Sequence, residues 1–269
     1  MTHPGGRLTG KTALITGAGS VGPGWGNGRA MAVVFAREGA QVFLVDRDEE
    51  SLETTARRIR DDGGTVVTAL GDVTDPASVE GFVGRCADEL DGLDILVNNV
   101  GGSRAGGVAE LSLTEWDNQI RTNLTSVFLG CKYAVPLMRE AGGGSIINVS
   151  SVSGMRYSGA AQVGYASAKA AIIQLSKVTA VQYAADRVRV NTVVPGQLHT
   201  PMVEARLAGQ RAGGDVEKLL AQRQARIPIG FMGDGRDTAY AALFFASDES
   251  RFVTGAEIVV DGGMSVRCD

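Results

Sequence analysis

Short apolar runs alternate with stretches of helical pattern along almost the whole chain. The runs at 11–16, 41–45 and 65–70 are each followed by a helical pattern, and the alternation continues to a last short run at 257–260. Because several of these runs are nearly continuous in apolar residues, they predict strands that are buried on both faces. Strands that alternate with helices predict an α/β fold, with a doubly wound parallel β-sheet and helices on both faces.

The chain of 269 residues shows no internal repeat, no low-complexity linker and no break in composition. We therefore expect a single domain over residues 1–269, of the Rossmann type, with its ligand at the carboxyl ends of the strands. Residues 1–8 are expected to form a polar tail. The polar, glycine-interrupted segment at about 200–230 is expected to act as a lid over a substrate.

Composition narrows the classes of partner and location. A net charge of -4 and the lack of a lysine or arginine block give no reason to expect nucleic acid as a partner. No apolar stretch approaches the roughly 20 residues that span a membrane, and the first residues lack the apolar core of a signal peptide. The three cysteines form no CxxC pair, so we expect no metal site, no disulfide framework and a cytoplasmic location.

A glycine-rich stretch, GAGSVGPGWGNG at 17–28, stands between the first predicted strand and the first predicted helix. Glycines there permit a tight turn and let backbone N–H groups approach a diphosphate, to which the helix N-terminus adds its dipole. The alternative for such a loop alone is a flexible connection, but its strand–loop–helix context favours dinucleotide binding. The candidate contacts in this stretch are Gly17, Ser20, Gly26, Asn27 and Gly28.

Acidic residues follow the second and third predicted strands. Asp46 stands where a carboxylate accepts hydrogen bonds from the adenosine ribose hydroxyls and repels a 2′-phosphate, so it favours NAD as the cofactor. The neighbouring Arg47 partly offsets that repulsion, which keeps NADP as the alternative. Asp72 is a candidate contact of the adenine edge, or else a turn aspartate.

Tyr165 and Lys169 are four residues apart in a predicted helix, so both lie on one helical face. A free tyrosine has a pKa of about 10, and a nearby lysine ammonium lowers it. Tyr165 can then take a proton from an alcohol or give one to a developing alkoxide. Ser151, at the end of a neighbouring strand, can hydrogen-bond the same substrate oxygen.

Over about residues 8–266 the chain resembles the short-chain dehydrogenase/reductase family. The resemblance is carried by seven groups of motifs in order, which together are far more specific than any one. They are Thr16-Gly17 with Gly26 and Gly28, Asp72-Val73, Asn98-Asn99-Val100-Gly101 followed by Asn123, Ser150-Ser151, Tyr165 with Lys169, Pro195-Gly196 with Thr200, and Thr254-Gly255 through Asp261-Gly262-Gly263.

The resemblance implies roles for individual residues. It makes Tyr165 the general acid/base and Lys169 both its pKa modulator and a ligand of the nicotinamide ribose. Ser151 matches the position that orients the substrate oxygen better than Ser150 does. The remaining implied positions are Asn123, which helps to hold a water leading to the lysine, and the cofactor contacts Asp72, Val73, Asn99, Gly101, Leu198 and Thr200.

The chain departs from the family pattern in three places. The first glycine loop is longer than TGxxxGxG, with the extra residues within 20–25, and its Trp25 either stacks over the cofactor or caps the loop. Val100 replaces the usual alanine of NNAG and adds bulk beneath the cofactor. The spacing between Ser151 and Tyr165 is longer than is common, which leaves the choice between Ser150 and Ser151 open.

The substrate is the least constrained part of the prediction. Arg104, Arg156 and Arg206 lie in segments that the resemblance places around the pocket, so one of them is a candidate for binding an acidic group, or all three are surface residues. A serine hydrolase that uses His199 is rejected, because neither Ser150 nor Ser151 lies in a GxSxG elbow.

The sequence therefore predicts an NAD-dependent oxidoreductase that interconverts a secondary alcohol and a ketone, with a small-molecule substrate and a homotetrameric assembly. Two alternatives remain. One is an NADP-dependent 3-oxoacyl thioester reductase, against which Asp46 counts. The other is a cofactor-binding regulatory protein with little turnover, against which the complete proton-transfer group counts.

Overall fold

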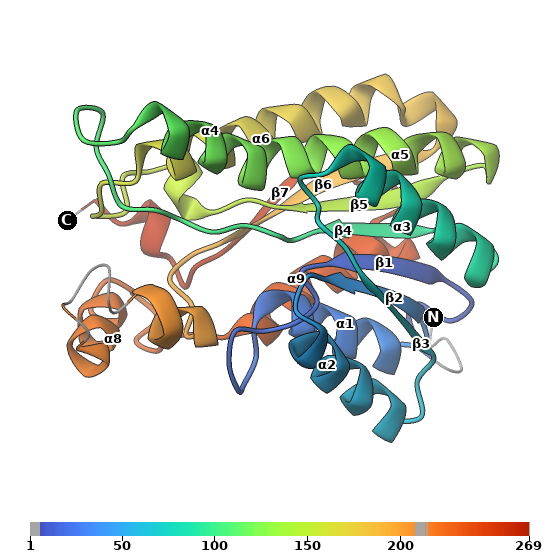
Figure 1. Ribbon diagram of the computed structural model, residues 1–269, viewed down its shortest axis with the longest axis horizontal. Coiled ribbons are helices and arrows are strands. Elements are labelled where there is room, and N and C mark those ends of the chain that lie inside the picture. Colours follow the sequence, from blue (N-terminus) through green and yellow to red (C-terminus); the bar gives the residue numbers. More distant parts are fainter. Residues whose placement is uncertain (1–5, 208–212, 214, 269) are drawn as a thin grey trace.

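Seven parallel strands form one continuous sheet at the centre of the molecule (Figure 1). The computed structural model describes residues 6–207, 213 and 215–268, without the side chains of 206 and 207, so most of the predicted tail lies outside the described residues. The strand order is β3-β2-β1-β4-β5-β6-β7. Their bounds are β1 Thr12–Thr16, β2 Gln41–Asp46, β3 Val66–Leu70, β4 Ile95–Asn98, β5 Gly144–Val149, β6 Val188–Pro195 and β7 Glu257–Val260.

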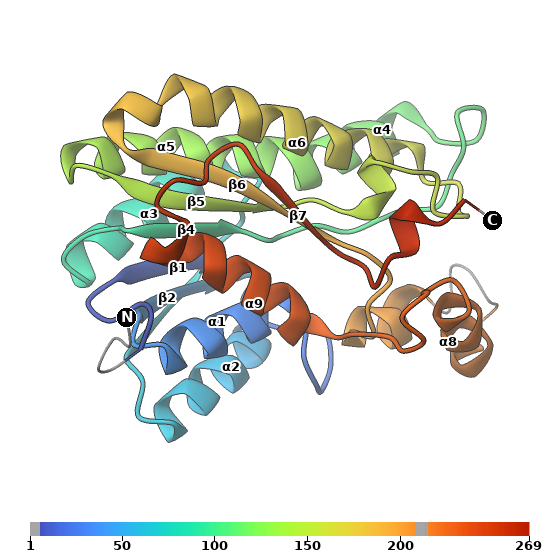
Figure 2. The ribbon, with the colours of Figure 1, turned by 180° about the vertical axis from the view of Figure 1, so that it is seen from behind.

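Helices cover both faces of this sheet (Figures 1 and 2). Successive strand residues point to opposite faces, so Ala13 and Ile15 of β1 join one apolar cluster and Leu14 joins the other. One face carries α1 Asn27–Arg37, α2 Glu49–Asp61 and α9 Gly235–Ala246. The other carries α3 Pro76–Glu89, α4 Leu113–Ile120, α5 Ser126–Glu140 and α6 Val163–Gln182. The predicted doubly wound α/β fold is confirmed.

Side-chain caps set the starts of several helices. The Asp75 carboxylate accepts a hydrogen bond from the N–H of Ser78, and Pro76 occupies the first helical position, where its missing N–H costs little. Asp234 begins α9 with a capping box, in which the Asp237 carboxylate accepts a hydrogen bond from the Asp234 N–H. These local signals explain why the predicted and observed elements correspond closely in order and position.

One predicted helix differs in its internal geometry. The sequence predicts a single helix over about 114–141, and the structure has α4 and α5 joined by a π-helical turn over Arg121–Thr125. The buried Asn123 lies in that turn, and its Nδ2 donates to the carbonyl of Gln119 at 2.9 Å. A π-turn shifts the helical phase, and such turns are frequent at functional sites.

Beyond the carboxyl ends of the strands, α8 (Val216–Gln224) stands apart from the two helical layers (Figure 1). It belongs to the predicted lid segment, of which residues 208–212 and 214 lie outside the described part. Among the described residues, no helix combines the length and apolar character required to cross a membrane.

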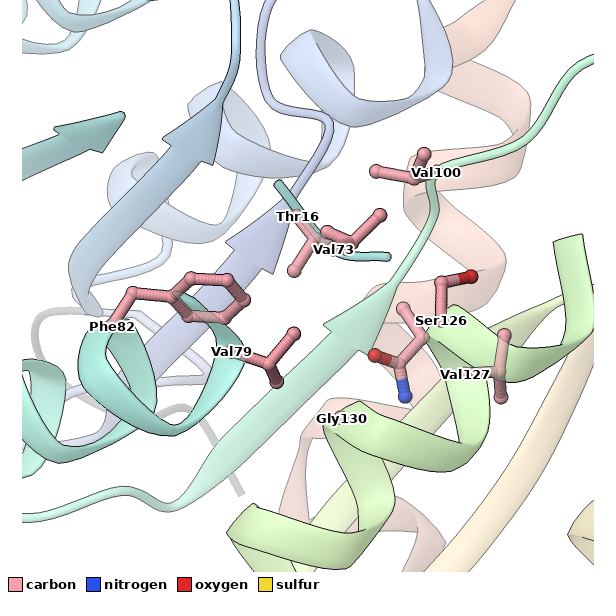
Figure 3. A pocket seen from close by; sticks show the side chains of 9 residues that line it. Thr16, Val73, Val79, Phe82, Val100, Ser126, Val127 and Gly130 are labelled. Carbon is pink, nitrogen blue, oxygen red and sulfur yellow. The ribbon is translucent and has the colours of Figure 1, made fainter. Parts of the chain in front are cut away.

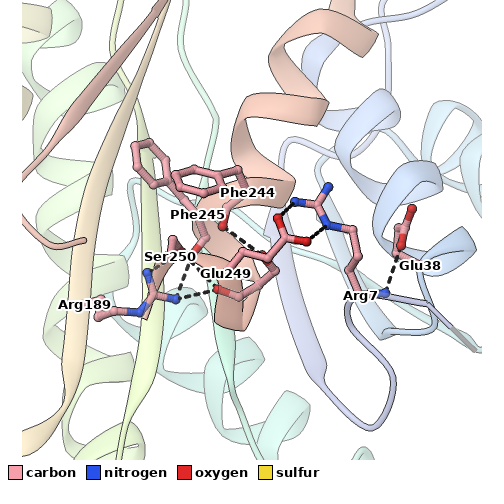
Figure 4. Close-up of polar contacts among 8 residues, drawn as sticks. Arg7, Glu38, Arg189, Phe244, Phe245, Glu249 and Ser250 are labelled. Carbon is pink, nitrogen blue, oxygen red and sulfur yellow. Dashed lines mark hydrogen bonds and ion pairs between the residues drawn. The ribbon is translucent and has the colours of Figure 1, made fainter. Parts of the chain in front are cut away.

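Two arginines bind the turn after α9 in different ways (Figure 4). Arg189 of β6 donates to the carbonyl of Phe245 at 2.8 Å and to the hydroxyl of Ser250 at 2.9 Å, and burial lowers the pKa of its guanidinium. Arg7, near the start of the described chain, forms an exposed ion pair with Glu249. The Arg189 guanidinium is partly buried, so its hydrogen bonds replace contacts with water that it loses on folding. The Arg7 ion pair is exposed, so both of its partners keep contacts with water.

We expect Arg189→Met to lower the free energy of unfolding by about 2 kcal/mol, because partly buried acceptors lose a charged donor. Arg7→Met should lower it by less than about 1 kcal/mol, because exposed ion pairs contribute little. Urea unfolding followed by circular dichroism measures both values. Equal losses in the two variants would contradict this account of the turn.

Candidate active site

A cleft of about 720 Å³ lies at the carboxyl ends of the strands and brings together nearly all of the predicted site residues. That volume is in the range of small-molecule and cofactor sites. Among the predicted site residues, Asn123 is the one that does not line the cleft. Those that do are Gly17, Ser20, Gly26, Asn27, Gly28, Asp46, Asp72, Val73, Asn99, Gly101, Ser151, Tyr165, Lys169, Leu198 and Thr200.

The glycine loop between β1 and α1 forms a cradle in this cleft. Gly17 has a φ of +66°, and a Cβ on Gly28 would collide with the carbonyl of Gly17, so both positions need glycine. The buried oxygens Ser20 Oγ and Asn27 Oδ1 have no hydrogen-bond partner among the described residues. Close backbone, a helix N-terminus and available polar atoms fit a dinucleotide in this position.

The extra residues of this loop are held from behind. Arg29 is only 2% exposed, and its Nη1 donates to the carbonyls of Gly22 at 3.1 Å and Gly24 at 3.0 Å. Trp25 does not line the cleft, because its ring lies near the guanidinium groups of Arg58 at 5.1 Å and Arg236 at 5.5 Å. Of the two alternatives for Trp25, the structure therefore supports the loop cap.

The two acidic residues at the strand ends differ in their surroundings. The half-buried Asp46 accepts hydrogen bonds from the N–H groups of Gly19 at 2.9 Å and Arg47 at 2.8 Å, which ties the glycine loop to β2. The exposed Asp72 accepts from the N–H and the hydroxyl of Thr74, both at 2.8 Å, and these bonds hold the pKa of its carboxyl below the ordinary value. Asp72 is thus a turn aspartate that also lines the cleft.

Tyr165 and Lys169 lie one turn apart on α6, with Lys169 Nζ 5.7 Å from the centre of the tyrosine ring. Lys169 is 2% exposed, and its Nζ donates to the carbonyl of Val149, the last residue of β5, at 2.8 Å. Burial lowers the pKa of Lys169 to about 8. A buried ammonium with a lowered pKa beside a half-buried tyrosine is suited to proton transfer.

The adjacent serines have different partners. The buried Ser150 donates its hydroxyl to the carbonyl of Lys169 at 2.7 Å, which joins the end of β5 to α6. Ser151 is half-buried, and its Oγ accepts a hydrogen bond from the N–H of Ser153 at 3.2 Å, which leaves its proton able to bind a ligand oxygen. The geometry therefore favours Ser151 over Ser150 as a substrate contact.

Asn123 supports the cleft from behind rather than lining it. Its Nδ2 donates to the carbonyl of Gly102 at 3.1 Å, and its Oδ1 accepts from the Gly102 N–H at 3.0 Å. A Cβ on Gly101 would lie 2.8 Å from Asn123 Oδ1 and 2.9 Å from Lys169 Nζ. Gly101 thus allows the loop after β4 to pass close to both side chains.

Val100 lies between the cleft and a small cavity of about 10 Å³ behind it (Figure 3). A Cβ on Gly17 would lie 2.9 Å from the Val100 Cγ2, so the two loops meet closely at this point. The bulk predicted for Val100 therefore lies against the glycine loop as well as in the wall of the cleft.

Of the three arginine candidates, Arg104 and Arg156 have described side chains, and neither lines the cleft. Arg104 is exposed and pairs with Glu115 at 3.8 Å, and Arg156 is exposed as well, which agrees with the alternative that both are surface residues. The side chain of Arg206 lies outside the described residues. His199 also does not line the cleft and pairs with Glu204 at 3.0 Å, which agrees with the rejection of a serine hydrolase.

Comparison with known proteins agrees with this geometry. A family model described as enoyl-(acyl carrier protein) reductase matches residues 23–265. The chain is 40% identical over 260 residues to 2,5-dichloro-2,5-cyclohexadiene-1,4-diol dehydrogenase LinX of Sphingobium indicum, covering 97% of this chain and 98% of the relative. It is 37% identical to 3-oxoacyl-[acyl-carrier-protein] reductase FabG of Thermotoga maritima, covering 97% and 100%. A crystal structure from Burkholderia xenovorans, described as a short-chain dehydrogenase/reductase, shares 61% identity over 98% of this chain and 100% of that chain, with a TM-score of 0.95.

The chain belongs to the short-chain dehydrogenase/reductase family. Its members are oxidoreductases, and the predicted family is confirmed. The match to the family model begins within the glycine loop, at residue 23, and includes Gly26, Asn27, Gly28 and α6, so it covers most of the residues that line the cleft.

Three features of this short-chain dehydrogenase/reductase were missed by the sequence analysis. Arg223 of α8 is 7% exposed, lines the cleft and donates to the carbonyl of Leu198 at 3.2 Å. Gln162 and Gln197 are also buried in the cleft wall. Gln162 carried a usable signal, because it lies one helical turn before Tyr165, whereas Arg223 is distant from every motif in the sequence.

The lowered pKa of Lys169 predicts that folding stability rises with pH above about 8. Below that pH the ammonium is protonated in both states, and its burial costs stability. Between about 8 and the ordinary value of 10.5 the unfolded chain keeps a proton that the folded chain has lost, so the free energy of unfolding increases. The free energy of unfolding, measured with urea, should increase between about pH 7.5 and about pH 9.5 by more in wild type than in Lys169→Met. A constant difference between the two proteins would contradict the burial of a titrating ammonium.

Proposed function

We propose that this protein is an NAD-dependent oxidoreductase that interconverts a secondary alcohol and a ketone. The observation that carries the proposal is the convergence of Tyr165, Lys169 and Ser151 on the cleft that also contains the glycine cradle. A protein that only bound a dinucleotide would have no need of a proton-transfer group beside it. The regulatory alternative is therefore less well supported.

In the proposed mechanism, Tyr165 takes the proton of the substrate hydroxyl during oxidation and returns it during reduction. A nicotinamide cofactor held in the cleft would supply the acceptor for the hydride of the carbinol carbon in oxidation, and the hydride donor in reduction. The positive charge of Lys169 favours the tyrosinate, and burial strengthens this effect because water screens the charge less. Ser151 donates a hydrogen bond to the same substrate oxygen and stabilises the developing alkoxide.

The remaining predicted residues would hold the cofactor. Gly17, Ser20, Gly26, Asn27 and Gly28 surround the proposed diphosphate position at the start of α1. The others would contact the adenosine, the nicotinamide ribose or the carboxamide; they are Asp46, Asp72, Val73, Asn99, Gly101, Tyr165, Lys169, Leu198 and Thr200. Asn123 would act through Gly102 and the water that leads to the lysine.

Asp46 supports NAD as the cofactor. Its carboxylate lines the cleft at the end of β2, where the adenosine ribose of a dinucleotide lies in this fold, and a negative charge there repels a 2′-phosphate. Arg47 lines the cleft beside Asp46, and its positive charge partly offsets the repulsion of a 2′-phosphate. NADP is therefore kept as the second candidate. The FabG relative is a 3-oxoacyl reductase by name, and the LinX relative is a diol dehydrogenase. Asp46 favours a function of the alcohol dehydrogenase type for this chain.

We also propose a homotetramer and a single domain in which residues 200–230 form the lid. Support for the assembly comes from exposed apolar side chains on α6 and β7, namely Val178, Val181 and Val259. Support for the lid comes from Arg223, which joins α8 to the backbone of Leu198 at the edge of the cleft.

Purified protein should reduce NAD when supplied with one or more members of a panel of aromatic, cyclic and carboxylated secondary alcohols. Tyr165→Phe should lower kcat by at least about a hundredfold, because the hydroxyl that transfers the proton is lost. Absorbance of the reduced cofactor measures the rate. Tyr157→Phe is the matched control, since Tyr157 is 82% exposed and does not line the cleft. Turnover that survives in Tyr165→Phe, or saturable NADH binding without turnover on any alcohol, would sink the enzyme proposal.

The preference for NAD over NADP should depend on Asp46. We expect Asp46→Asn to narrow the ratio of kcat/KM for the two cofactors by about tenfold or more, because the carboxylate charge that repels the 2′-phosphate is removed. Glu50→Gln serves as a control for a nearby charge, since Glu50 is exposed on α2 and does not line the cleft. A wild type that uses NADP better than NAD would overturn this reading of Asp46.

A further inference from the structure

Two glutamine side chains are buried in the cleft wall, and their hydrogen bonding differs. Gln162 is 6% exposed, and its Nε2 donates to the hydroxyls of Ser153 at 2.7 Å and Ser158 at 3.1 Å. Gln197 is 7% exposed and follows Gly196 after the end of β6. Its Oε1 has no hydrogen-bond partner in the part of the chain that the structure describes.

An amide oxygen that is buried without a partner destabilises the folded state by about 1–3 kcal/mol. Most buried polar atoms in native proteins are satisfied, so each exception requires a physical reason. Gln197 lines the same cleft as Tyr165 and Ser151. A ligand bound in that cleft can donate the missing hydrogen bond to the Gln197 oxygen. An oxygen in the closed core would have no access to such a ligand.

The cleft that contains Gln197 offers a ligand apolar side chains as well as polar groups. Leu198 and Val203 are buried, Met202 and Met264 are half-buried, and all four line the cleft. Pockets of this kind bind a mostly apolar body and fix its orientation with a few polar groups. The Gln162 amide donates to Ser153 and Ser158, whereas the Gln197 oxygen still has the capacity to accept a hydrogen bond.

We propose that Gln197 is a specificity-determining residue whose amide oxygen accepts a hydrogen bond from a second hydroxyl of the substrate, separate from the carbinol that reacts. The preferred substrates are then small, largely apolar diols in the direction of oxidation and hydroxyketones in the direction of reduction. The second hydroxyl is bound and not transformed. This inference rests on the proposed function, because it takes the reacting oxygen to lie at Tyr165 and Ser151.

The first test compares cyclohexanol with cyclohexane-1,2-, 1,3- and 1,4-diol as substrates with NAD. Wild type should have a kcat/KM at least about tenfold higher for one of the diols than for cyclohexanol, because a buried acceptor disfavours an analogue that lacks the donor. In Gln197→Met this preference should disappear, because the diol and cyclohexanol then meet the same apolar side chain. Gln222→Met is the matched control, because Gln222 is exposed on α8 and does not line the cleft.

A binding form of the experiment separates this inference from the proposed function. In the Tyr165→Phe background, the complex with NADH is titrated with cyclohexanone and with 2-, 3- and 4-hydroxycyclohexanone, and NADH fluorescence reports binding without turnover. One hydroxyketone should bind more tightly than cyclohexanone, and Gln197→Met should abolish the difference. Equal affinities overturn the Gln197 proposal even if the enzyme turns over alcohols. A weaker affinity for NADH in Gln197→Met would also overturn it, since the amide would then contact the cofactor.

Discussion

The cleft depends on a lysine ammonium that is buried at the end of a central strand. Lys169 reaches from α6 to the carbonyl of Val149, at the end of β5, and Ser150 returns a hydrogen bond to the carbonyl of Lys169. Together the two bonds join the end of the strand to the helix and set the height of Tyr165 above the sheet. Burial costs this ammonium part of its charge, and the same burial keeps its field on the tyrosine unscreened by water.

Close packing of backbone around that lysine determines the rest of the geometry. Gly101 passes between Asn123 and Lys169 where a Cβ would not fit, and Gly28 packs against the carbonyl of Gly17 in the same way. The π-turn that contains Asn123 lets its side chain pair with both backbone groups of Gly102. The loops that line the cleft are thus held by hydrogen bonds to their backbone, and the ligand-facing atoms remain available.

Buried oxygen atoms without a hydrogen-bond partner among the described residues lie at both proposed ends of the cleft. Ser20 and Asn27 carry unpartnered buried oxygens at the proposed diphosphate end, and Gln197 carries one at the proposed substrate end. Each such atom destabilises the folded chain unless a ligand satisfies it. The loss of stability and the gain in specificity at these oxygens have the same physical origin. An acceptor that is kept for a polar group of a ligand has no hydrogen-bond partner while the site is empty.

The sequence by itself determined the alternation of strands and helices, the glycine cradle, Asp46, and the spacing of Tyr165 and Lys169, because these depend on local periodicity and on short motifs. It did not determine which serine keeps its hydroxyl proton available for a ligand, where Trp25 lies, or that Arg223 and Gln197 line the cleft. Ser150 and Ser151 are chemically alike and adjacent, so only the packing of α6 against β5 distinguishes them. Arg223 and Gln197 are far from Tyr165 in the chain, and only the tertiary structure, by placing α8 and the residues after β6 beyond the carboxyl ends of the strands, decided that all three line one cleft.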